Sequence, residues 1–269
     1  MKPYLSLIRF DRPIGSLLLL WPTISALVLA SNGRPPILVS TVFILGVILT
    51  RSAGCIINDL ADIKFDKYVE RTKNRPLVLG TVSKKSALIL FVTLIGIALF
   101  LAILVLKTET LLMSIPALIL LISYPFMKRF FAIPQIYLGV AFSFGILMAF
   151  IEIKGQINLS GWLLFITNLF WTLGYDTIYA MVDLDDDKKT NIKTSAKTLG
   201  KNVVLFIAIC YIFSTFDLII LNSLFSFKII SWLIIFIIIT LFLSFIGYSF
   251  YAINNTHSIN NVIISLYNR

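Results

Sequence analysis

Long apolar stretches alternate with short polar connections along most of this chain. The stretches are about 17 to 25 residues long, the length that a helix needs to cross a hydrocarbon core of roughly 30 Å. We predict membrane-spanning helices at about 14–31, 36–57, 85–106, 109–127, 132–152, 161–182, 202–222 and 228–250. A further stretch at 257–268 is short for a span and rich in Asn. The pattern predicts an all-α fold, a polytopic membrane bundle of eight to nine transmembrane helices.

The composition agrees with this pattern. Of the 269 residues, 58% are hydrophobic and 13% are charged, and the mean hydropathy is +0.94. A soluble domain of this size needs a polar shell that such a composition does not supply. We therefore expect residues 1–269 to form a single domain embedded in a lipid bilayer. Cys55 and Cys210 both fall inside predicted spans, so we expect them to be small buried residues.

Lysine and arginine are concentrated on one set of connections, before 14–31 and after 36–57, 109–127 and 161–182. Positively charged connections stay in the cytoplasm. We therefore predict a multi-pass protein of the bacterial inner membrane with these connections facing the cytoplasm. The net charge of +10 then reflects membrane orientation and an anion held by these loops, and we expect no nucleic-acid partner.

The first acidic stretch, N-D-L-A-D-I-K-F-D, follows the span 36–57. Asn58, Asp62 and Asp66 recur every four residues and therefore lie along one face of a helix. At that spacing their oxygens can share a cation, with water and a ligand in the remaining positions.

A second acidic stretch ends the span 161–182. Asp176, Tyr179, Asp183 and Asp187 follow a helical spacing that puts them on one stripe. Asp183 and Asp187 repeat the spacing of the first stretch. A solvated helix end explains one such stretch, but two with matching spacing, each followed by basic residues, favour two half-sites that face each other.

Basic residues accompany both stretches. The long loop after Asp66 carries Arg71, Lys73 and Arg75, which we expect to bring positive charge to a bound anion, although positive-inside bias alone also accounts for them. Such a loop beside a site often acts as a lid.

Two further basic positions lie between or within spans. Tyr124 and Lys128 are four residues apart with Arg129 beside them, and a topogenic pair of charges is the alternative. Arg51 lies on the face of Asn58 and about two turns deeper. It either snorkels to the headgroups or faces a polar cavity, where its planar fork holds a carboxylate or phosphate.

These residue types point to a metal-assisted reaction of a diphosphate. Carboxylate oxygens favour Mg²⁺, which binds proteins through one or two carboxylates plus substrate phosphates. A zinc site is disfavoured because no Cys or His cluster is present. Two Mg²⁺ ions beside Lys and Arg neutralise a diphosphate leaving group. At the mouth of an apolar bundle the rest of the substrate must be apolar, which describes a polyprenyl diphosphate.

Several stretches carry a family resemblance: R-F-D-R-P-I-G-S-L-L-L-L-W-P-T, R-S-A-G-C-I-I-N-D-L-A-D-I-K-F-D followed by R-T-K-N-R-P-L, S-Y-P-F-M-K-R, and Y-D-T-I-Y-A-M-V-D-L-D-D-D. On these, from about residue 8 to 200, the chain resembles the UbiA superfamily of intramembrane aromatic prenyltransferases. It is most similar to members that act on 4-hydroxybenzoate in ubiquinone biosynthesis. The resemblance implies a bundle with a central cavity open to the bilayer, through which an isoprenoid tail threads.

The resemblance also implies roles for single residues. Metal and diphosphate binding falls to Asn58, Asp62, Asp66, Asp183 and Asp187, and Tyr124 and Lys128 match a Y-x-x-x-K motif with Arg129 beside it. We add Arg75 and Tyr179 as substrate-binding candidates. We expect Arg51 to hold the acceptor carboxylate and Asp176 to orient the acceptor or act as base.

The expected reaction begins with Mg²⁺-assisted loss of diphosphate, which gives an allylic cation that aromatic rings stabilise. The ring carbon ortho to the phenol of 4-hydroxybenzoate then attacks. Homogentisate, a naphthoate, haem or a glycerol phosphate are alternative acceptors. A divalent-cation transporter would carry its acids near the midplane on broken helices, and a CDP-alcohol phosphotransferase would carry D-G-x-x-A-R, which this sequence lacks.

Overall fold

The computed structural model describes residues 2–69, 72–184 and 192–225, and every regular element in those ranges is helical. The expected all-α fold is confirmed. The predicted spans at 228–250 and 257–268 lie outside the described residues. In chain order the helices are α1 (Lys2–Leu7), α2 (Ile14–Ala30), α3 (Ile37–Asp66), α4 (Lys84–Val105), α5 (Thr108–Met127), α6 (Gln135–Lys154), α7 (Leu159–Val182), α9 (Ser195–Leu199), the 3-10 helix η1 (Gly200–Asn202) and α10 (Val203–Phe225).

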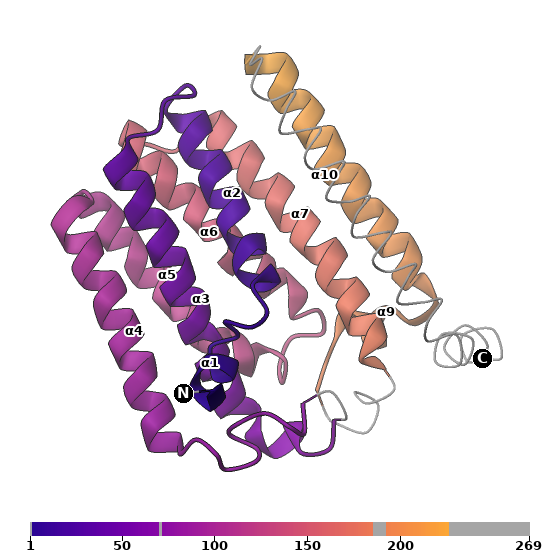
Figure 1. Cartoon of the computed structure of the whole chain (residues 1–269). Coiled ribbons are helices and arrows are strands. Elements are labelled where there is room, and N and C mark those ends of the chain that lie inside the picture. The colour runs from indigo at the N-terminus through magenta and orange to yellow at the C-terminus, as the bar shows by residue number, and fades with distance from the viewer. Residues whose placement is uncertain (1, 70–71, 185–191, 226–269) are drawn as a thin grey trace.

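The long helices run side by side in an up-and-down bundle (Figure 1). Helices α3, α4, α5 and α6 and the segment Ser195–Asp217 are each long and apolar enough to cross a membrane, and α2 is a shorter apolar helix. Helix α4 leaves large apolar side chains such as Leu88 and Phe100 exposed, which suits contact with lipid. The chain is a multi-pass membrane protein.

Local sequence explains where several helices begin and end. The side chains of Ser83, Asn158 and Thr194 accept hydrogen bonds from backbone N–H groups in the first turns of α4, α7 and α9. Gly155 ends α6 with a φ of 73°, a left-handed conformation that glycine adopts without a Cβ clash. These polar residues and this glycine mark helix ends, and the apolar stretches between them form continuous helices.

Helix α2 contacts α3, α6 and α7, while α4 lies on the outer side of α3 and α10 lies along α7 (Figure 1). Backbones approach closely where α6 crosses α2, because a Cβ at Gly145 would lie 2.6 Å from Thr23 Oγ1. The largest buried apolar cluster lies at the end of the bundle where α2 and α6 end, and it includes Leu27, Ile146 and Phe150.

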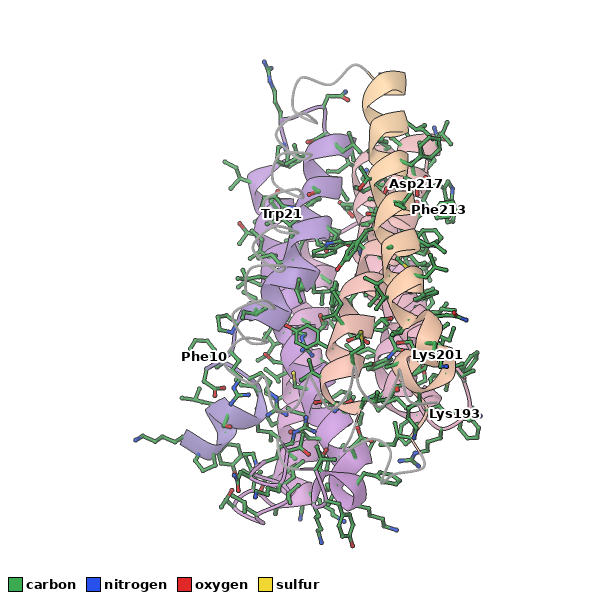
Figure 2. All side chains as sticks on the ribbon, turned by 90° about the vertical axis from the view of Figure 1, so that its right-hand side faces the viewer. Phe10, Trp21, Lys193, Lys201, Phe213 and Asp217 are labelled. Atoms are coloured by element: carbon green, nitrogen blue, oxygen red, sulfur yellow. The ribbon has the colours of Figure 1, made fainter. Side chains whose placement is uncertain are left out.

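Helix α3 continues beyond the predicted span end at 57 as far as Asp66, so the first acidic stretch is helical. The carboxyl ends of α3, α5 and α7 meet at one end of the bundle, the lower end in Figure 1. In the rotated view, Lys193 and Lys201 lie toward this same end, whereas Trp21 and Asp217 lie toward the opposite end (Figure 2). The fold therefore brings the acidic stretches and basic connections together.

Candidate functional site

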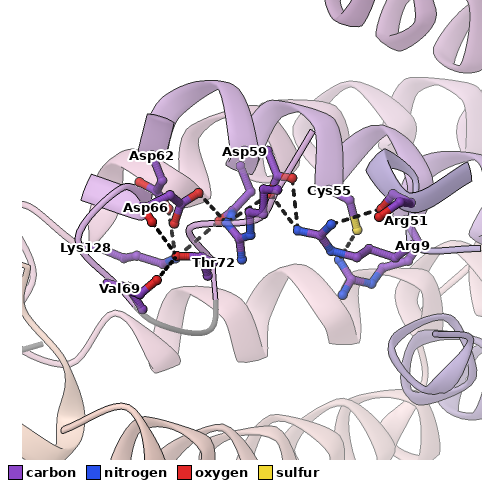
Figure 3. Close-up of polar contacts among 12 residues, drawn as sticks. Arg9, Arg51, Cys55, Asp59, Asp62, Asp66, Val69, Thr72 and Lys128 are labelled. Carbon is purple, nitrogen blue, oxygen red and sulfur yellow. Dashed lines mark hydrogen bonds and ion pairs between the residues drawn. The ribbon is translucent and has the colours of Figure 1, made fainter. Parts of the chain in front are cut away.

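The carboxylates of the first acidic stretch are buried at the end of α3. Asp59 is 1% exposed, and Asp62 and Asp66 are each 6% exposed. Burying a charge is costly unless it is paired, so each of these carboxylates needs a cation. The structure supplies one for each of them, from the N-terminal arm, from the loop that follows α3 and from the end of α5 (Figure 3).

Lys128 lies across the middle of this stretch. It caps the end of α5, and its Nζ lies 3.2 Å from Asn58 Oδ1 and 3.5 Å from Asp62 Oδ2. The same ammonium lies 5.4 Å from the centre of the Tyr124 ring, a cation–π distance. The Y-x-x-x-K spacing thus brings an aromatic face and a cation to the predicted oxygen ligands.

Arg129 lies next to the stretch but on the outer surface of α3. Its Nη2 donates to the Ala61 carbonyl at 3.1 Å, and its guanidinium lies over the rings of Phe65 and Phe126. The two neighbouring basic residues therefore have different partners: Lys128 contacts the side chains of Asn58 and Asp62, whereas Arg129 contacts a backbone carbonyl.

The loop after α3 folds back over the acidic stretch. Arg75 Nη1 donates to Asp66 Oδ2 at 2.5 Å and lies 3.1 Å from Asp59 Oδ1. Thr72 Oγ1 donates to the Asp66 carbonyl at 3.0 Å, which closes the turn. The loop thus brings positive charge to α3, as the sequence predicts for Arg75, while Lys73 is exposed and Arg71 lies outside the described residues.

Sequence reasoning missed two members of this network, Asp59 and Arg9. Arg9 Nη2 donates to both carboxylate oxygens of Asp59, at 2.9 and 3.0 Å. Asp59 is turned by one residue from the stripe of Asn58 and Asp62, so the four-residue spacing did not include it. The available signal was the acid itself, since an Asp at the end of an apolar helix needs a counter-charge.

Arg51 lies deeper in the bundle. Its Nη1 donates to Cys55 Sγ at 3.1 Å, and its guanidinium packs on α2 at Gly15, where a Cβ would lie 2.5 Å from Nη2. Arg51 and Lys128 are both within electrostatic reach of the Asp176 carboxylate on α7. Arg51 therefore lies where α3 packs on α2, within electrostatic reach of α7.

The second acidic stretch is described as far as Leu184, so Asp187 lies outside the described residues. Asp176 is half-buried on α7, and Asp183 is the residue that caps the end of this helix. The Asp176 carboxylate lies within electrostatic reach of Lys128, the residue that contacts Asp62 of α3. Tyr179 is 57% exposed, and its ring meets that of Tyr175 edge-on at 6.4 Å.

The segment before α9 is joined to the connection between α5 and α6 by hydrogen bonds of its backbone N–H groups. The Lys193 N–H donates to the Lys128 carbonyl at 2.9 Å, and the Ser195 N–H donates to Gln135 Oε1 at 3.0 Å. The segment that leads into α9 is thereby bound to the connection between α5 and α6. Ser195 Oγ also donates to Thr177 Oγ1 of α7 at 2.9 Å, so the same segment contacts α7.

The donor chemistry of the site fits a hard divalent ion. In the described ranges no three His, Cys, Asp or Glu side chains are grouped closely enough to hold a metal, and one predicted ligand, Asp187, is outside those ranges. The oxygens of Asn58 and Asp62 nevertheless converge on one cation, the Lys128 ammonium. Amide and carboxylate oxygens of this kind suit Mg²⁺, which completes its coordination with water and substrate phosphates.

Comparison with known proteins adds relatives of stated activity. The model of the UbiA prenyltransferase family matches residues 19–266. The chain is 54% identical over 209 residues to the 4-hydroxybenzoate octaprenyltransferase of Nitrosomonas eutropha, covering 78% of this chain and 73% of that protein. It is 50% identical over 230 residues to the protein of the same name from Paraburkholderia phytofirmans, covering 86% and 80% of the two chains.

Several solved structures share the fold. A UbiA homolog from Aeropyrum pernix superposes with a TM-score of 0.73 at 24% identity, over 93% of this chain and 97% of that one. A UbiA homolog from Archaeoglobus fulgidus, bound to GPP and Mg²⁺, superposes with a TM-score of 0.75 at 20% identity, over 92% and 87% of the two chains. At these identities the likeness is one of architecture.

Proposed function

We propose, because this chain belongs to the UbiA prenyltransferase family, that it transfers a polyprenyl group from polyprenyl diphosphate to 4-hydroxybenzoate in ubiquinone biosynthesis. The new bond forms at the ring carbon ortho to the hydroxyl, and the products are 3-polyprenyl-4-hydroxybenzoate and diphosphate. The names of relatives that are 50 and 54% identical support the acceptor. The observation that carries the proposal is the set of buried carboxylates and basic side chains at one end of an apolar bundle.

The donor diphosphate binds at the end of α3. Asn58, Asp62, Asp66, Asp183 and Asp187 are the residues that would hold Mg²⁺. The bound ion would draw negative charge from the leaving diphosphate. Lys128 and Arg75, which already lie at these carboxylates, neutralise the remaining charge on the diphosphate, with Arg129 at the rim. The allylic C–O bond breaks, and the diphosphate leaves with both electrons.

The acceptor binds between α3 and α7. Arg51 holds the carboxylate of 4-hydroxybenzoate, since its planar fork suits two carboxylate oxygens. The ring carbon ortho to the phenol bonds to the allylic carbon, and its proton is lost. Asp176, within electrostatic reach of both Arg51 and Lys128, orients the acceptor or takes this proton. The rings of Tyr124 and Tyr179 offer π faces to the allylic cation.

The orientation in the membrane follows from charge. Basic residues gather at the site end, so we propose that this end faces the cytoplasm of a bacterial inner membrane. The polyprenyl tail then lies among the apolar helices and the lipid. A divalent-cation transporter is a weaker candidate, because the acids of α3 lie at a helix end and are paired with basic side chains.

The direct test incubates membranes that contain the chain with labelled 4-hydroxybenzoate, Mg²⁺ and donors of graded tail length, followed by analysis of the lipid extract. We expect a prenylated, lipid-soluble product that EDTA abolishes and added Mg²⁺ restores. Homogentisate offered in equal amount is the competing acceptor. Product formed in the presence of EDTA would contradict the metal role, and preferential labelling of homogentisate would contradict the acceptor.

A further inference from the structure

Asp59 is the most buried acid at the site, and two arginines share it. Arg9 Nη2 contacts both of its oxygens, at 2.9 and 3.0 Å, and Arg75 Nη1 lies 3.1 Å from Oδ1. The carboxylate is 1% exposed. Asp59 and Asp66 are seven residues apart, nearly two full helical turns, so their carboxylates point the same way and share Arg75, whereas Asn58 is turned away by about 100°. Asp59 thus shares Arg75 with Asp66 and has Arg9 as a partner of its own.

The charges of Arg9, Arg75 and Asp59 are balanced only when Asp66 is included. Arg9 and Arg75 carry two positive charges against the one negative charge of Asp59, so the three residues leave one positive charge. Asp66 neutralises it here, through its 2.5 Å contact with the same Arg75 nitrogen that reaches Asp59. If Asp66 binds a metal ion instead, the positive charge of the arginines is no longer neutralised and can attract an anion.

We propose that Asp59, held by Arg9, is a positioning residue that keeps the Arg75 guanidinium beside the carboxylates of α3, where it receives the diphosphate of the donor. The proposal rests on the proposed function in one respect, that the anion is a diphosphate. Asp59 itself contacts neither substrate. When Asp66 binds a metal ion, Arg75 still has the Asp59 carboxylate as a partner. A guanidinium has five N–H donors, enough to bind this carboxylate and a phosphate at the same time.

The N-terminal arm is built around this contact. Arg9 has a φ of 58°, a left-handed conformation that residues other than glycine rarely adopt. Its Nη1 also donates to the Ser6 carbonyl at 3.0 Å, at the end of α1. Leu7 is fully buried in a cluster with Ile56 of α3 and Leu77 of the loop. The buried Leu7 and the Ser6 carbonyl therefore fix the arm on the N-terminal side of Arg9, whose side chain reaches Asp59.

The test measures how Asp59 and Arg75 are coupled. We expect Asp59→Asn to raise the donor KM roughly tenfold, as for the loss of a charge-assisted contact, with the acceptor KM unchanged. Arg75→Gln should raise the donor KM at least as much. In the double variant the effect should equal that of Arg75→Gln alone, because Asp59 has then lost the group it positions. Effects that multiply in the double variant would overturn the proposal.

A second readout does not depend on turnover. Inorganic pyrophosphate with Mg²⁺ should raise the melting temperature of the purified protein, and Asp59→Asn should reduce this shift as strongly as Arg75→Gln does. Asp11→Asn is the matched control, because the Asp11–Arg12 pair is 3.8 Å apart and largely exposed. A merely structural Asp59 would lower the melting temperature and leave the pyrophosphate shift at its wild-type size, which would refute the proposal.

Arg9→Lys keeps the inference testable if Asp59→Asn does not accumulate. Lysine retains the charge but cannot bind both oxygens in the manner of a guanidinium, so an intermediate loss of pyrophosphate shift is expected, and a wild-type shift would count against us. The two proposals fail separately. If Asp59→Asn reduces the pyrophosphate shift but the wild-type protein forms no prenylated 4-hydroxybenzoate, only the proposed acceptor is contradicted. If the wild-type protein forms this product but Asp59→Asn leaves the shift unchanged, only the role of Asp59 is contradicted.

Discussion

At the scale of single residues, the site depends on how close neighbouring atoms lie. Arg51 packs on α2 where Gly15 has no side chain, and a Cβ there would lie 2.5 Å from Arg51 Nη2 and 2.9 Å from Nε. Only a shift of the guanidinium makes room for a methyl group. The absence of a side chain at Gly15 thus determines where the proposed carboxylate-binding group lies.

Gly15→Ala is therefore expected to raise the KM for 4-hydroxybenzoate several-fold while leaving the KM for the donor unchanged, since the head group of Arg51 moves and the diphosphate site does not. Steady-state assays with each substrate varied in turn measure this. Gly46→Ala is the control, because a Cβ at Gly46 meets nothing within 4 Å. Equal effects of the two substitutions would argue against the role of Arg51.

Lys128 is the second residue whose position matters for the proposed chemistry. Lys128→Gln removes the cation that lies between Asn58 and Asp62 and that we propose neutralises the diphosphate. We expect kcat/KM to fall on the order of 10²-fold, the size seen when one transition-state charge contact is lost. Lys85→Gln, an exposed lysine at the same end, serves as control. A Lys128→Gln enzyme with wild-type kcat/KM would exclude Lys128 from the reaction.

At the scale of helices, the two ends of the bundle have different roles. One end carries the paired acids, whereas the other is closed by apolar packing and by Glu152 of α6. Glu152 Oε2 accepts from the Lys107 N–H at 3.0 Å and from Thr110 Oγ1 at 2.7 Å, and so caps the start of α5 from a neighbouring helix. We therefore expect this carboxylate to stabilise the fold and to have no role in the proposed reaction at the opposite end.

Glu152→Ala should lower the free energy of unfolding by about 1–3 kcal/mol, because the buried Thr110 hydroxyl and the Lys107 N–H lose their acceptor. Glu152→Gln keeps an amide oxygen and should cost less. Thermal unfolding in detergent measures both variants, with the exposed Glu109→Ala at the same helix end as reference. The KM values of the folded fraction should not change, and a selective loss of substrate affinity would show that the two ends are not independent.

At the scale of the whole molecule, the direction of insertion decides which compartment supplies the substrates. We predict that a membrane-impermeant maleimide labels Lys67→Cys in inside-out vesicles only and Lys154→Cys in right-side-out vesicles only. Both positions are exposed, at opposite ends of the bundle, and the native cysteines Cys55 and Cys210 are buried and give little background. The reverse labelling pattern would invert the proposed topology.

Much of the architecture could be predicted from the sequence, because the length of an apolar stretch and the helical repeat are local properties. The predicted spans from 14–31 to 202–222 correspond to α2, α3, α4, α5, α6, α7 and α10. The shared face of Asn58, Asp62 and Asp66 follows from a helical repeat near four residues, which holds in any surroundings. The pairing of Lys128 with this face was an inference from likeness, since nothing local relates α5 to α3.

By itself, then, the sequence determined a membrane-embedded helical chain, the positions of its helices and the oxygen-rich stripe on α3. Only the tertiary structure decided which cation meets which carboxylate. It put Arg9 and Arg75 on Asp59, Lys128 on Asp62 and Glu152 at the start of α5. The physical reason is that spacing along a helix sets the direction of a side chain relative to its own axis, whereas its partner depends on how neighbouring helices are rotated and how the loops fold back.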